Sequence, residues 1–466
     1  MQIRFGTDGW RGIISDDFTF ENVRRVASAI ASFYNDTQPS PRKIAIGYDT
    51  RFLSGKYARL VADVLSYNGI DVILSDRAVP TPALSFAAKT KKLTAGIMIT
   101  ASHNPASYNG IKIKTGEGGA AGVEVTREVE NRLPSAAIDL GPGEGKKIIN
   151  EDLTRDYIKF LRSYIDFKRI KNARFRVLVD PMHGSGNSFI KEVLEGTSIR
   201  LDFVRNEINP SFGGLRPEPV LENLKDTQEK LKKEKYDLCI VLDGDADRIA
   251  AFAGRGEFIH PQQILGLLML HLHCDRKMKG AVVKTIAGTN LIDNIAAKLN
   301  MELYETSVGF KYISELMVKE DILVGGEEAG GMGFKGYIPE RDGTMAGLLL
   351  LEMMAYRKKP MLKILEEMEK EFGKYYYLRK DLKIKGVCPG IEDFKSIKAI
   401  LGKPVVELKD YDGIKLICSD SSWVMLRASG TEPLVRVYSE SRSLSWAKKL
   451  LGFGESFIAK LCSIVS

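Results

Sequence analysis

Short apolar segments rich in β-branched residues recur along the chain, each followed by glycines or a turn and then by a helical pattern. They lie at residues 43–48, 70–75, 94–99, 175–179, 236–242, 280–284 and 321–324. Strands that alternate with helices at this spacing are typical of βαβ units, which build mostly parallel sheets. The sequence therefore predicts an α/β protein.

Changes in composition at three places divide the chain into four parts. Residues 136–147 show no periodicity and are typical of a linker, residues 253–256 predict a tight turn, and a long helical pattern from Arg341 ends near Gly373. A chain of 466 residues, 44% of them hydrophobic, is long enough for several cores. We therefore predict four domains, which comprise residues 1–140, 150–253, 256–370 and 375–466.

Composition and charge argue against several classes of protein. The 68 lysines and arginines exceed the 60 acidic residues by eight, and this excess is spread along the chain, which disfavours nucleic-acid binding. The five cysteines are widely spaced without a Cys-x-x-Cys pair, so neither a disulfide framework nor a zinc knuckle is indicated. The first residues lack the apolar core of a signal peptide, and apolar runs such as 264–270 are too short to span a bilayer. We expect a cytoplasmic protein with no membrane partner.

Ser102 is the first candidate for chemistry. It lies in residues 100–105, Thr-Ala-Ser-His-Asn-Pro, after an apolar run, so we expect it at the carboxyl edge of a sheet, where ligand sites are common. The Asn-Pro pair that follows and the Asn-Gly pair at 109–110 predict turns that would display the hydroxyl beside His103 and Lys112. A serine nucleophile needs such a base or cation. Taken alone, a serine in a turn is more often a helix cap, and no Gly-x-Ser-x-Gly elbow indicates a hydrolase.

Three aspartates at alternate positions form the second candidate site. Asp243, Asp245 and Asp247 follow the apolar segment 238–242, so their carboxylates are expected to converge in one buried loop. Burying three negative charges is costly unless a metal or an arginine offsets them, and a set of oxygen ligands alone suits Mg²⁺. An EF-hand is excluded, because the loop lacks the glycine and the glutamate required at its sixth and twelfth positions. The alternative for such acidic residues is a solvated turn.

Two glycine-containing loops are suited to a phosphate or a sugar. Residues 427–433, Arg-Ala-Ser-Gly-Thr-Glu-Pro, offer a guanidinium, two hydroxyls and backbone amides, with Arg436 beyond them, which is typical of an anion cradle. Residues 325–331, Gly-Gly-Glu-Glu-Ala-Gly-Gly, place Glu327 and Glu328 on a backbone that can approach a ligand closely. Carboxylates there can accept hydrogen bonds from sugar hydroxyls.

Taken together, these segments resemble the α-D-phosphohexomutase family, which includes phosphoglucomutases and phosphomannomutases. The resemblance covers essentially the whole chain and rests on five motifs in the same order. They are residues 5–12 (Phe-Gly-Thr-Asp-Gly-Trp-Arg-Gly), the serine loop, the three-aspartate loop, the Gly-Glu-Glu loop and the Arg-x-Ser-Gly-Thr-Glu-Pro loop. The resemblance implies three related α/β domains with mixed, mostly parallel sheets and a smaller C-terminal α+β domain around a central cleft.

The resemblance also implies a role for each candidate residue. The catalytic set would be Ser102, as the phosphoserine, with His103, Lys112 and Arg11. Mg²⁺ would be held by Asp243, Asp245, Asp247 and an oxygen on Ser102. The substrate would be bound by Arg248, Lys311, Glu327, Glu328, Arg427, Ser429, Gly430, Thr431 and Arg436. Small hexose phosphates would be the partners and glucose 1,6-bisphosphate the activator of a monomer or small homo-oligomer.

The reaction that the resemblance implies exchanges two phosphates. Phospho-Ser102 gives its phosphoryl group to the free hydroxyl of a hexose monophosphate, and the resulting 1,6-bisphosphate turns around before it returns the other phosphoryl group to the serine. Positioning and charge neutralisation are what phosphoryl transfer chiefly requires. The paired Glu327 and Glu328 predict interconversion of glucose 1-phosphate and glucose 6-phosphate, with mannose phosphates as further substrates.

Two departures from the family pattern bear on the substrate and on the proton carrier. Ala329 stands where many glucose-type members have a serine, which removes one hydroxyl that could contact the sugar. Gly331 stands where some mannose-type members have a histidine, so a general acid or base has to come from elsewhere. The candidates are Lys112, ranked first, Arg11 and His103.

Three alternatives stay open. Phosphoglucosamine mutase is the nearest alternative within the family. An aspartyl-type sugar phosphatase would use Asp243 as its nucleophile, because an Asp-x-Asp pattern after a strand also suits that chemistry. A non-catalytic sensor of sugar phosphates would keep the binding cleft without turnover.

Overall fold

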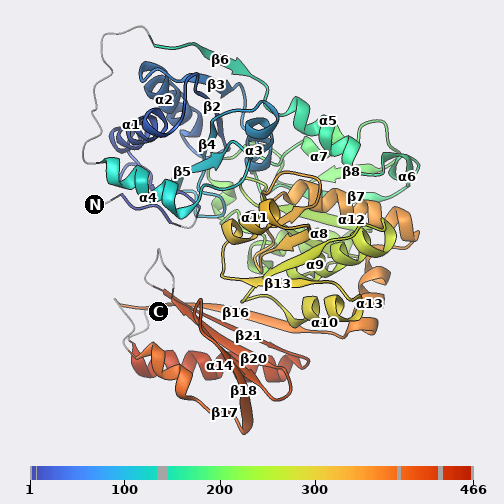
Figure 1. Ribbon diagram of the computed structural model, residues 1–466. Coiled ribbons are helices and arrows are strands. Elements are labelled where there is room, and N and C mark those ends of the chain that lie inside the picture. Colours follow the sequence, from blue (N-terminus) through green and yellow to red (C-terminus); the bar gives the residue numbers. More distant parts are fainter. Residues whose placement is uncertain (1–2, 7, 134–144, 386–389, 429–433, 463–466) are drawn as a thin grey trace. The chain divides into compact units, whose positions relative to one another are not determined.

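The computed structural model describes residues 3–6, 8–133, 145–385, 390–428 and 434–462 (Figure 1). The chain forms two compact units. One comprises Met1–Val282 and Gly309–Leu365, and the other comprises Val283–Val308 and Glu366–Ser466.

A six-stranded mixed sheet in the order β1-β5-β4-β2-β3-β6 forms the first part of the chain. Its strands are β1 (Trp10–Ile13), β2 (Lys43–Tyr48), β3 (Asp71–Ser75), β4 (Ala95–Ile99), β5 (Tyr108–Thr115) and β6 (Ile148–Glu151), and the helices are α1 (Phe20–Thr37), α2 (Ser54–Tyr67), α3 (Thr81–Thr90) and α4 (Val123–Arg132). Strands β2, β3, β4 and β6 pair in parallel, whereas β5 is antiparallel to β4 and β1. The connection between β4 and β5 therefore carries Ser102, and β5 carries Lys112.

A five-stranded sheet in the order β11-β10-β9-β7-β8 comes next in the chain. Its strands are β7 (Arg176–Asp180), β8 (Arg200–Phe203), β9 (Leu238–Leu242), β10 (Ile249–Ala253) and β11 (Glu257–Ile259), and the helices are α5 (Arg155–Tyr164), α6 (Phe167–Lys171), α7 (Phe189–Val193) and α8 (Lys225–Lys233). Every residue of β9 is buried, which explains why this strand is wholly apolar. Because β9 and β10 are antiparallel neighbours, the three aspartates lie in the hairpin between them.

A four-stranded sheet has the order β13-β12-β14-β15. The strands are β12 (Ala281–Thr285), β13 (Leu303–Thr306), β14 (Ile322–Gly326) and β15 (Met332–Phe334), and the helices are α9 (Pro261–Leu270), α10 (Asn290–Lys298), α11 (Phe310–Lys319), α12 (Gly343–Arg357) and α13 (Met361–Phe372), with a π-helical turn at His271–Asp275. The hairpin between β14 and β15 carries Glu327 and Glu328. The single helical pattern expected after Arg341 forms two helices, because Lys358 is left-handed with φ of 52° and Pro360 cannot donate a helical hydrogen bond.

The C-terminal part is an antiparallel sheet in the order β16-β21-β20-β19-β18-β17 with one long helix, α14 (Leu444–Leu461). Its strands are β16 (Tyr376–Lys383), β17 (Ala399–Ile400), β18 (Lys403–Lys409), β19 (Ile414–Cys418), β20 (Trp423–Ala428) and β21 (Leu434–Ser441). Apolar residues of the strands and of α14 share one core, in which Leu450 and Ile458 pack with Val424 and Val437. The α+β character expected for this part is confirmed.

The predicted α/β class with mixed sheets is confirmed, and two further details differ from expectation. Asn109 and Gly110 lie within β5 and not in a turn. A Cβ atom at Gly110 would lie 2.5 Å from the Thr100 carbonyl oxygen and 2.7 Å from that of Trp10, so the glycine permits a close approach of backbones.

Cys462 is disulfide-bonded, which the cysteine spacing did not predict. Among the described residues, none of the helices has the length and apolar character needed to cross a bilayer.

Candidate active site

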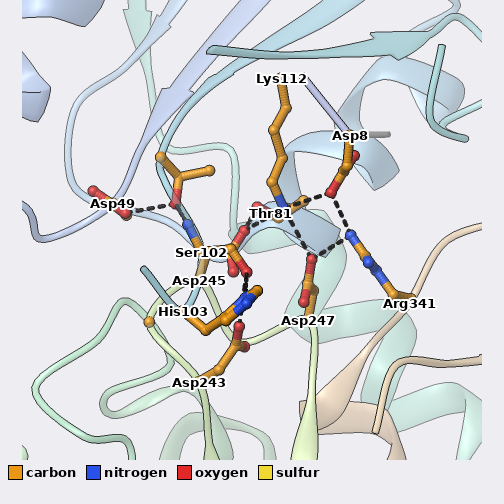
Figure 2. Close-up of polar contacts among 12 residues, drawn as sticks. Asp8, Asp49, Thr81, Ser102, His103, Lys112, Asp243, Asp245, Asp247 and Arg341 are labelled. Carbon is orange, nitrogen blue, oxygen red and sulfur yellow. Dashed lines mark hydrogen bonds and ion pairs between the residues drawn. The ribbon is translucent and has the colours of Figure 1, made fainter. Parts of the chain in front are cut away.

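Ser102 lies just beyond the end of the buried strand β4 in a strained, buried loop. Its backbone is left-handed, with φ of 53°, a conformation that non-glycine residues adopt only when their surroundings enforce it. The Ser102 hydroxyl donates to Asp243 Oδ2 at 3.0 Å, and its Oγ lies 3.3 Å from His103 Nδ1. The serine and the first aspartate, 141 residues apart in sequence, therefore lie in direct contact (Figure 2).

Arg51 enforces the conformation of the serine loop. Its guanidinium donates to four backbone carbonyl oxygens, those of Ser102 at 2.6 Å, Asn104 at 2.7 Å, Pro105 at 2.8 Å and Tyr108 at 3.0 Å. Asp49 Oδ2 lies 3.2 Å from Arg51 Nε, and it also accepts a hydrogen bond of 2.6 Å from the hydroxyl of Thr100. Sequence reasoning missed Arg51, although the charged residues of Asp49-Thr50-Arg51 directly after an apolar strand are a signal that could have found it.

The three aspartates converge as predicted. Asp243, Asp245 and Asp247 are fully buried, and one carboxylate oxygen from each lies within 4.8 Å of the others. Burial and the negative charges of Asp247 and Asp245 raise the pKa of Asp243 well above its usual value. The Oδ1 atoms of Asp245 and Asp247 have no hydrogen-bond partner. Buried carboxylate oxygens without a donor are well suited to bind a divalent cation, so these residues fit a metal.

Lys112 balances part of this negative charge. Its Nζ lies 2.8 Å from Asp245 Oδ2, 3.0 Å from Asp247 Oδ2 and 2.9 Å from Asp8 Oδ2 (Figure 2). Burial alone would lower the pKa of Lys112, but Asp245, Asp247 and Asp8 together raise it above its usual value. A raised pKa favours the protonated form of Lys112, which argues against the role of general acid or base that was ranked first for it from the sequence. The N-terminal Asp8 was not among the predicted site residues.

Arg341 is a second cation that sequence reasoning missed. Its Nη2 lies 2.7 Å from Asp247 Oδ2 and 2.6 Å from Asp8 Oδ2, while its Nη1 donates to Glu327 Oε2 at 3.1 Å. Burial is the main reason that the pKa of Glu327 is raised, and Arg341 opposes that shift. The aspartate loop and the Gly-Glu-Glu loop are therefore joined through one guanidinium. The signal in the sequence was the charged run Glu340-Arg341-Asp342 directly before an apolar helix.

Other predicted residues lie around this cluster or on the same unit. Arg11 is on β1 and donates to Asn104 Oδ1 at 2.6 Å. The backbone N–H of Arg248 donates to Asp243 Oδ1 at 3.1 Å. Lys311 is at the start of α11, with its Nζ 4.8 Å from the centre of the Tyr312 ring. Glu328 is buried in the hairpin after β14.

The predicted phosphate loop belongs to the other unit, where its two arginines face each other. Arg427 on β20 and Arg436 on β21 are direct cross-strand partners, so both side chains lie on one face of the sheet. Arg427 Nε donates to Asp412 Oδ1 at 2.7 Å, and Arg436 Nε lies 3.6 Å from Asp381 Oδ2. Each guanidinium group already pairs with a carboxylate, and further donors on the two groups would be able to bind an anion. Ser429, Gly430 and Thr431 lie outside the described residues.

The chain matches four protein families that together describe one architecture. They are the phosphoglucomutase/phosphomannomutase α/β/α domain I over residues 2–137, domain II over 155–256, domain III over 260–372, and the C-terminal domain over 379–452. These matches cover most of the chain and follow one another in order.

Curated relatives and a solved structure agree with these matches. A phosphoglucomutase/phosphomannomutase of Thermococcus kodakarensis is 32% identical over 464 residues, which cover 97% of each chain. A phosphoglucosamine/phosphogalactosamine mutase of Sulfurisphaera tokodaii is 30% identical over 459 residues, which cover 96% of this chain and 97% of the relative. The structure of a "putative phosphomannomutase" of Thermus thermophilus is 33% identical, with a TM-score of 0.89 over 98% of this chain and 99% of that one. This chain therefore belongs to the phosphoglucomutase/phosphomannomutase family of intramolecular phosphotransferases.

Proposed function

We propose that this protein interconverts hexose 1-phosphates and hexose 6-phosphates through a phosphorylated Ser102 and a 1,6-bisphosphate intermediate. The observation that carries the proposal is the 3.0 Å contact between Ser102 Oγ and Asp243, at the edge of a buried cluster of three aspartates. A serine in this position can carry a phosphoryl group whose charge a bound cation offsets. We propose glucose phosphates as preferred substrates and mannose phosphates as further ones.

We propose Mg²⁺ as the cation, held by Asp243, Asp245, Asp247 and an oxygen on Ser102. The buried Oδ1 atoms without donors support this assignment, and hard oxygen ligands are those that Mg²⁺ prefers. When bound, Mg²⁺ supplies charge neutralisation at the phosphoryl group. Lys112 adds a fixed positive charge beside the same carboxylates.

We assign the remaining residues as follows. In each transfer the P–O bond to the donor oxygen breaks and a P–O bond to the acceptor oxygen forms. The acceptor hydroxyl gives up its proton, and the released donor oxygen takes up a proton to become a hydroxyl. His103 is the candidate that holds a proton at the serine, because its Nδ1 lies 3.3 Å from Ser102 Oγ.

Arg11 orients the serine loop through Asn104. Glu327 and Glu328 would accept hydrogen bonds from sugar hydroxyls, with Arg248 and Lys311 beside them, and Arg427 and Arg436 would bind the phosphate that is not transferred.

Phosphoglucosamine mutase is the second candidate function. The relative of Sulfurisphaera tokodaii that carries this activity in its name is nearly as similar as the phosphoglucomutase/phosphomannomutase of Thermococcus kodakarensis, and Ala329 removes a hydroxyl from the sugar loop. We also propose that the protein acts in the cytoplasm, that glucose 1,6-bisphosphate activates it, and that its four domains have the boundaries predicted from the sequence.

A side-by-side assay tests both candidates. Turnover of glucose, mannose and glucosamine 1-phosphates is measured with purified protein, Mg²⁺ and a trace of glucose 1,6-bisphosphate. The proposal expects the highest kcat/KM with glucose 1-phosphate and no turnover in Ser102→Ala. Turnover of glucosamine 1-phosphate alone would assign the protein to the second candidate. Phosphopeptide mapping that places phosphate on Asp243 and not on Ser102 would replace both with an aspartyl phosphatase.

A further inference from the structure

Arg341 occupies the space that a side chain at position 331 would need. It lies in the connection between β15 and α12, with only 4% of its surface exposed. A Cβ atom built on Gly331 would overlap Arg341 Cδ and would lie 2.7 Å from Glu327 Oε2. The φ angle of Gly331 is not in the positive region, so its backbone conformation does not require glycine. A side chain at this position would therefore have to displace Arg341 or Glu327.

The guanidinium of Arg341 joins three carboxylates from distant parts of the sequence. Asp8, Asp247 and Glu327 lie within 2.6–3.1 Å of its two terminal nitrogens. A planar fork with several donors can contact three carboxylates at once, whereas a lysine ammonium is a single point charge on a flexible chain. Replacing the arginine with lysine would therefore keep the charge and lose the geometry.

Arg341 acts on the aspartate loop chiefly through its charge. It shares Asp247 Oδ2 with Lys112, while Asp247 Oδ1 has no hydrogen-bond partner. A buried positive charge at this distance opposes the binding of a cation by the same carboxylate. Its effect on Glu327 is different, since a 3.1 Å hydrogen bond fixes where that carboxylate points.

We propose that Arg341 is a positioning residue with two separable effects: its fork orients Glu327 toward the sugar, and its charge moderates the affinity of the aspartate loop for a divalent cation. Gly331 is the steric partner that makes room for it. The sugar part rests on the proposed function, whereas the cation part and the steric coupling do not.

Two substitutions separate charge from geometry. Arg341→Lys keeps the charge, so Mg²⁺ affinity measured by calorimetry without substrate stays within about threefold of the parent, while KM for glucose 1-phosphate rises about tenfold through loss of the fork. Arg341→Met removes both the positive charge and the hydrogen-bonding guanidinium, so KM rises and Mg²⁺ binds about tenfold more tightly. Arg276→Met is the control, because Arg276 pairs with the buried Glu352 and contacts none of the site carboxylates. Weaker Mg²⁺ binding in Arg341→Met, or an unchanged KM in Arg341→Lys, would overturn the proposal.

A double-mutant cycle tests the steric coupling. Gly331→Ala in the parent displaces Arg341 and should lower the melting temperature and raise KM. The same change in Arg341→Ala, which lacks the Cγ and Cδ atoms that meet the new methyl group, fills vacated space and should change the melting temperature and KM much less. Equal effects in both backgrounds would refute the coupling. If the parent shows no mutase turnover, the proposed function fails, but the Mg²⁺ titration and the melting temperatures still test the role of Arg341.

Discussion

Replacing Arg51 with lysine is the most informative perturbation of the serine loop. The guanidinium makes four hydrogen bonds to loop carbonyls within 2.6–3.0 Å and an ion pair with Asp49. A lysine ammonium has three donors that point from one atom, so it can keep the pair with Asp49 and reach one or two of the carbonyls. At least two charge-assisted hydrogen bonds are therefore lost.

The magnitude follows from those two bonds. Each hydrogen bond to a charged group contributes about 1.5–3 kcal/mol, so the native loop loses about 3–6 kcal/mol before relaxation. That loss is enough to release Ser102 from its strained backbone conformation, with φ of 53°. A displacement of the reacting atom by about 1 Å can lower kcat about 100-fold. The KM for the hexose phosphate should change little, because Arg51 contacts none of the proposed sugar-binding residues.

The assay combines kinetics with a structural readout. Values of kcat and KM for glucose 1-phosphate are measured for Arg51→Lys, and amide hydrogen exchange is followed over residues 100–108, where faster exchange is expected. Arg59→Lys is the matched control, since it alters an exposed arginine paired with Asp63 on α2. If kcat of Arg51→Lys stays within threefold of the parent and exchange of the loop is unchanged, the reasoning about Arg51 is wrong.

Three further predictions follow from individual residues. Asp245→Asn removes one of the three buried carboxylate charges and should weaken Mg²⁺ binding more than about tenfold by calorimetry; equal affinity would contradict the metal assignment. Burial raises the pKa of Asp342 to about 7, so folding takes up a proton between pH 4 and 7 and stability falls as pH rises through that range. The melting temperature of the parent minus that of Asp342→Asn should accordingly decrease from pH 4 to pH 7, and a constant difference would refute this. Arg436→Met removes one of two facing guanidinium groups and should raise KM for glucose 1-phosphate about tenfold while kcat falls less; an unchanged KM would place the phosphate elsewhere.

The candidate residues that the structure brings together around Ser102 and Asp243 include four that share one property, which is that each follows a buried strand. Ser102 follows β4 and the three aspartates follow β9, and apolar strands that end in polar loops are visible in the sequence. That Ser102 and the aspartates lie close together was inferred from a resemblance, and only the tertiary structure shows the contact between Ser102 and Asp243. The Asn-Gly pair of β5 was misread, because a glycine that permits a close approach between strands has the same local pattern as a glycine in a turn.

The residues that were missed act through partners far away in the chain. Arg51 contacts a loop more than 50 residues later, and Arg341 contacts Asp8 across 333 residues. The local patterns around Arg51 and Arg341 can mark these residues as unusual but do not identify their partners, because surface arginines occur in the same sequence contexts.

The sequence by itself indicated the class of fold, the alternation of seven strand segments with helices, and the residue types proposed to carry phosphate and metal, because periodicity and strand-end motifs are local properties. Only the tertiary structure decided which charges neutralise which. Asp8, Asp247 and Glu327 converge on Arg341, and the pKa of Lys112 is raised because three carboxylates surround it. Electrostatic energy depends on distance in space and on burial, and neither is written in the order of residues along the chain.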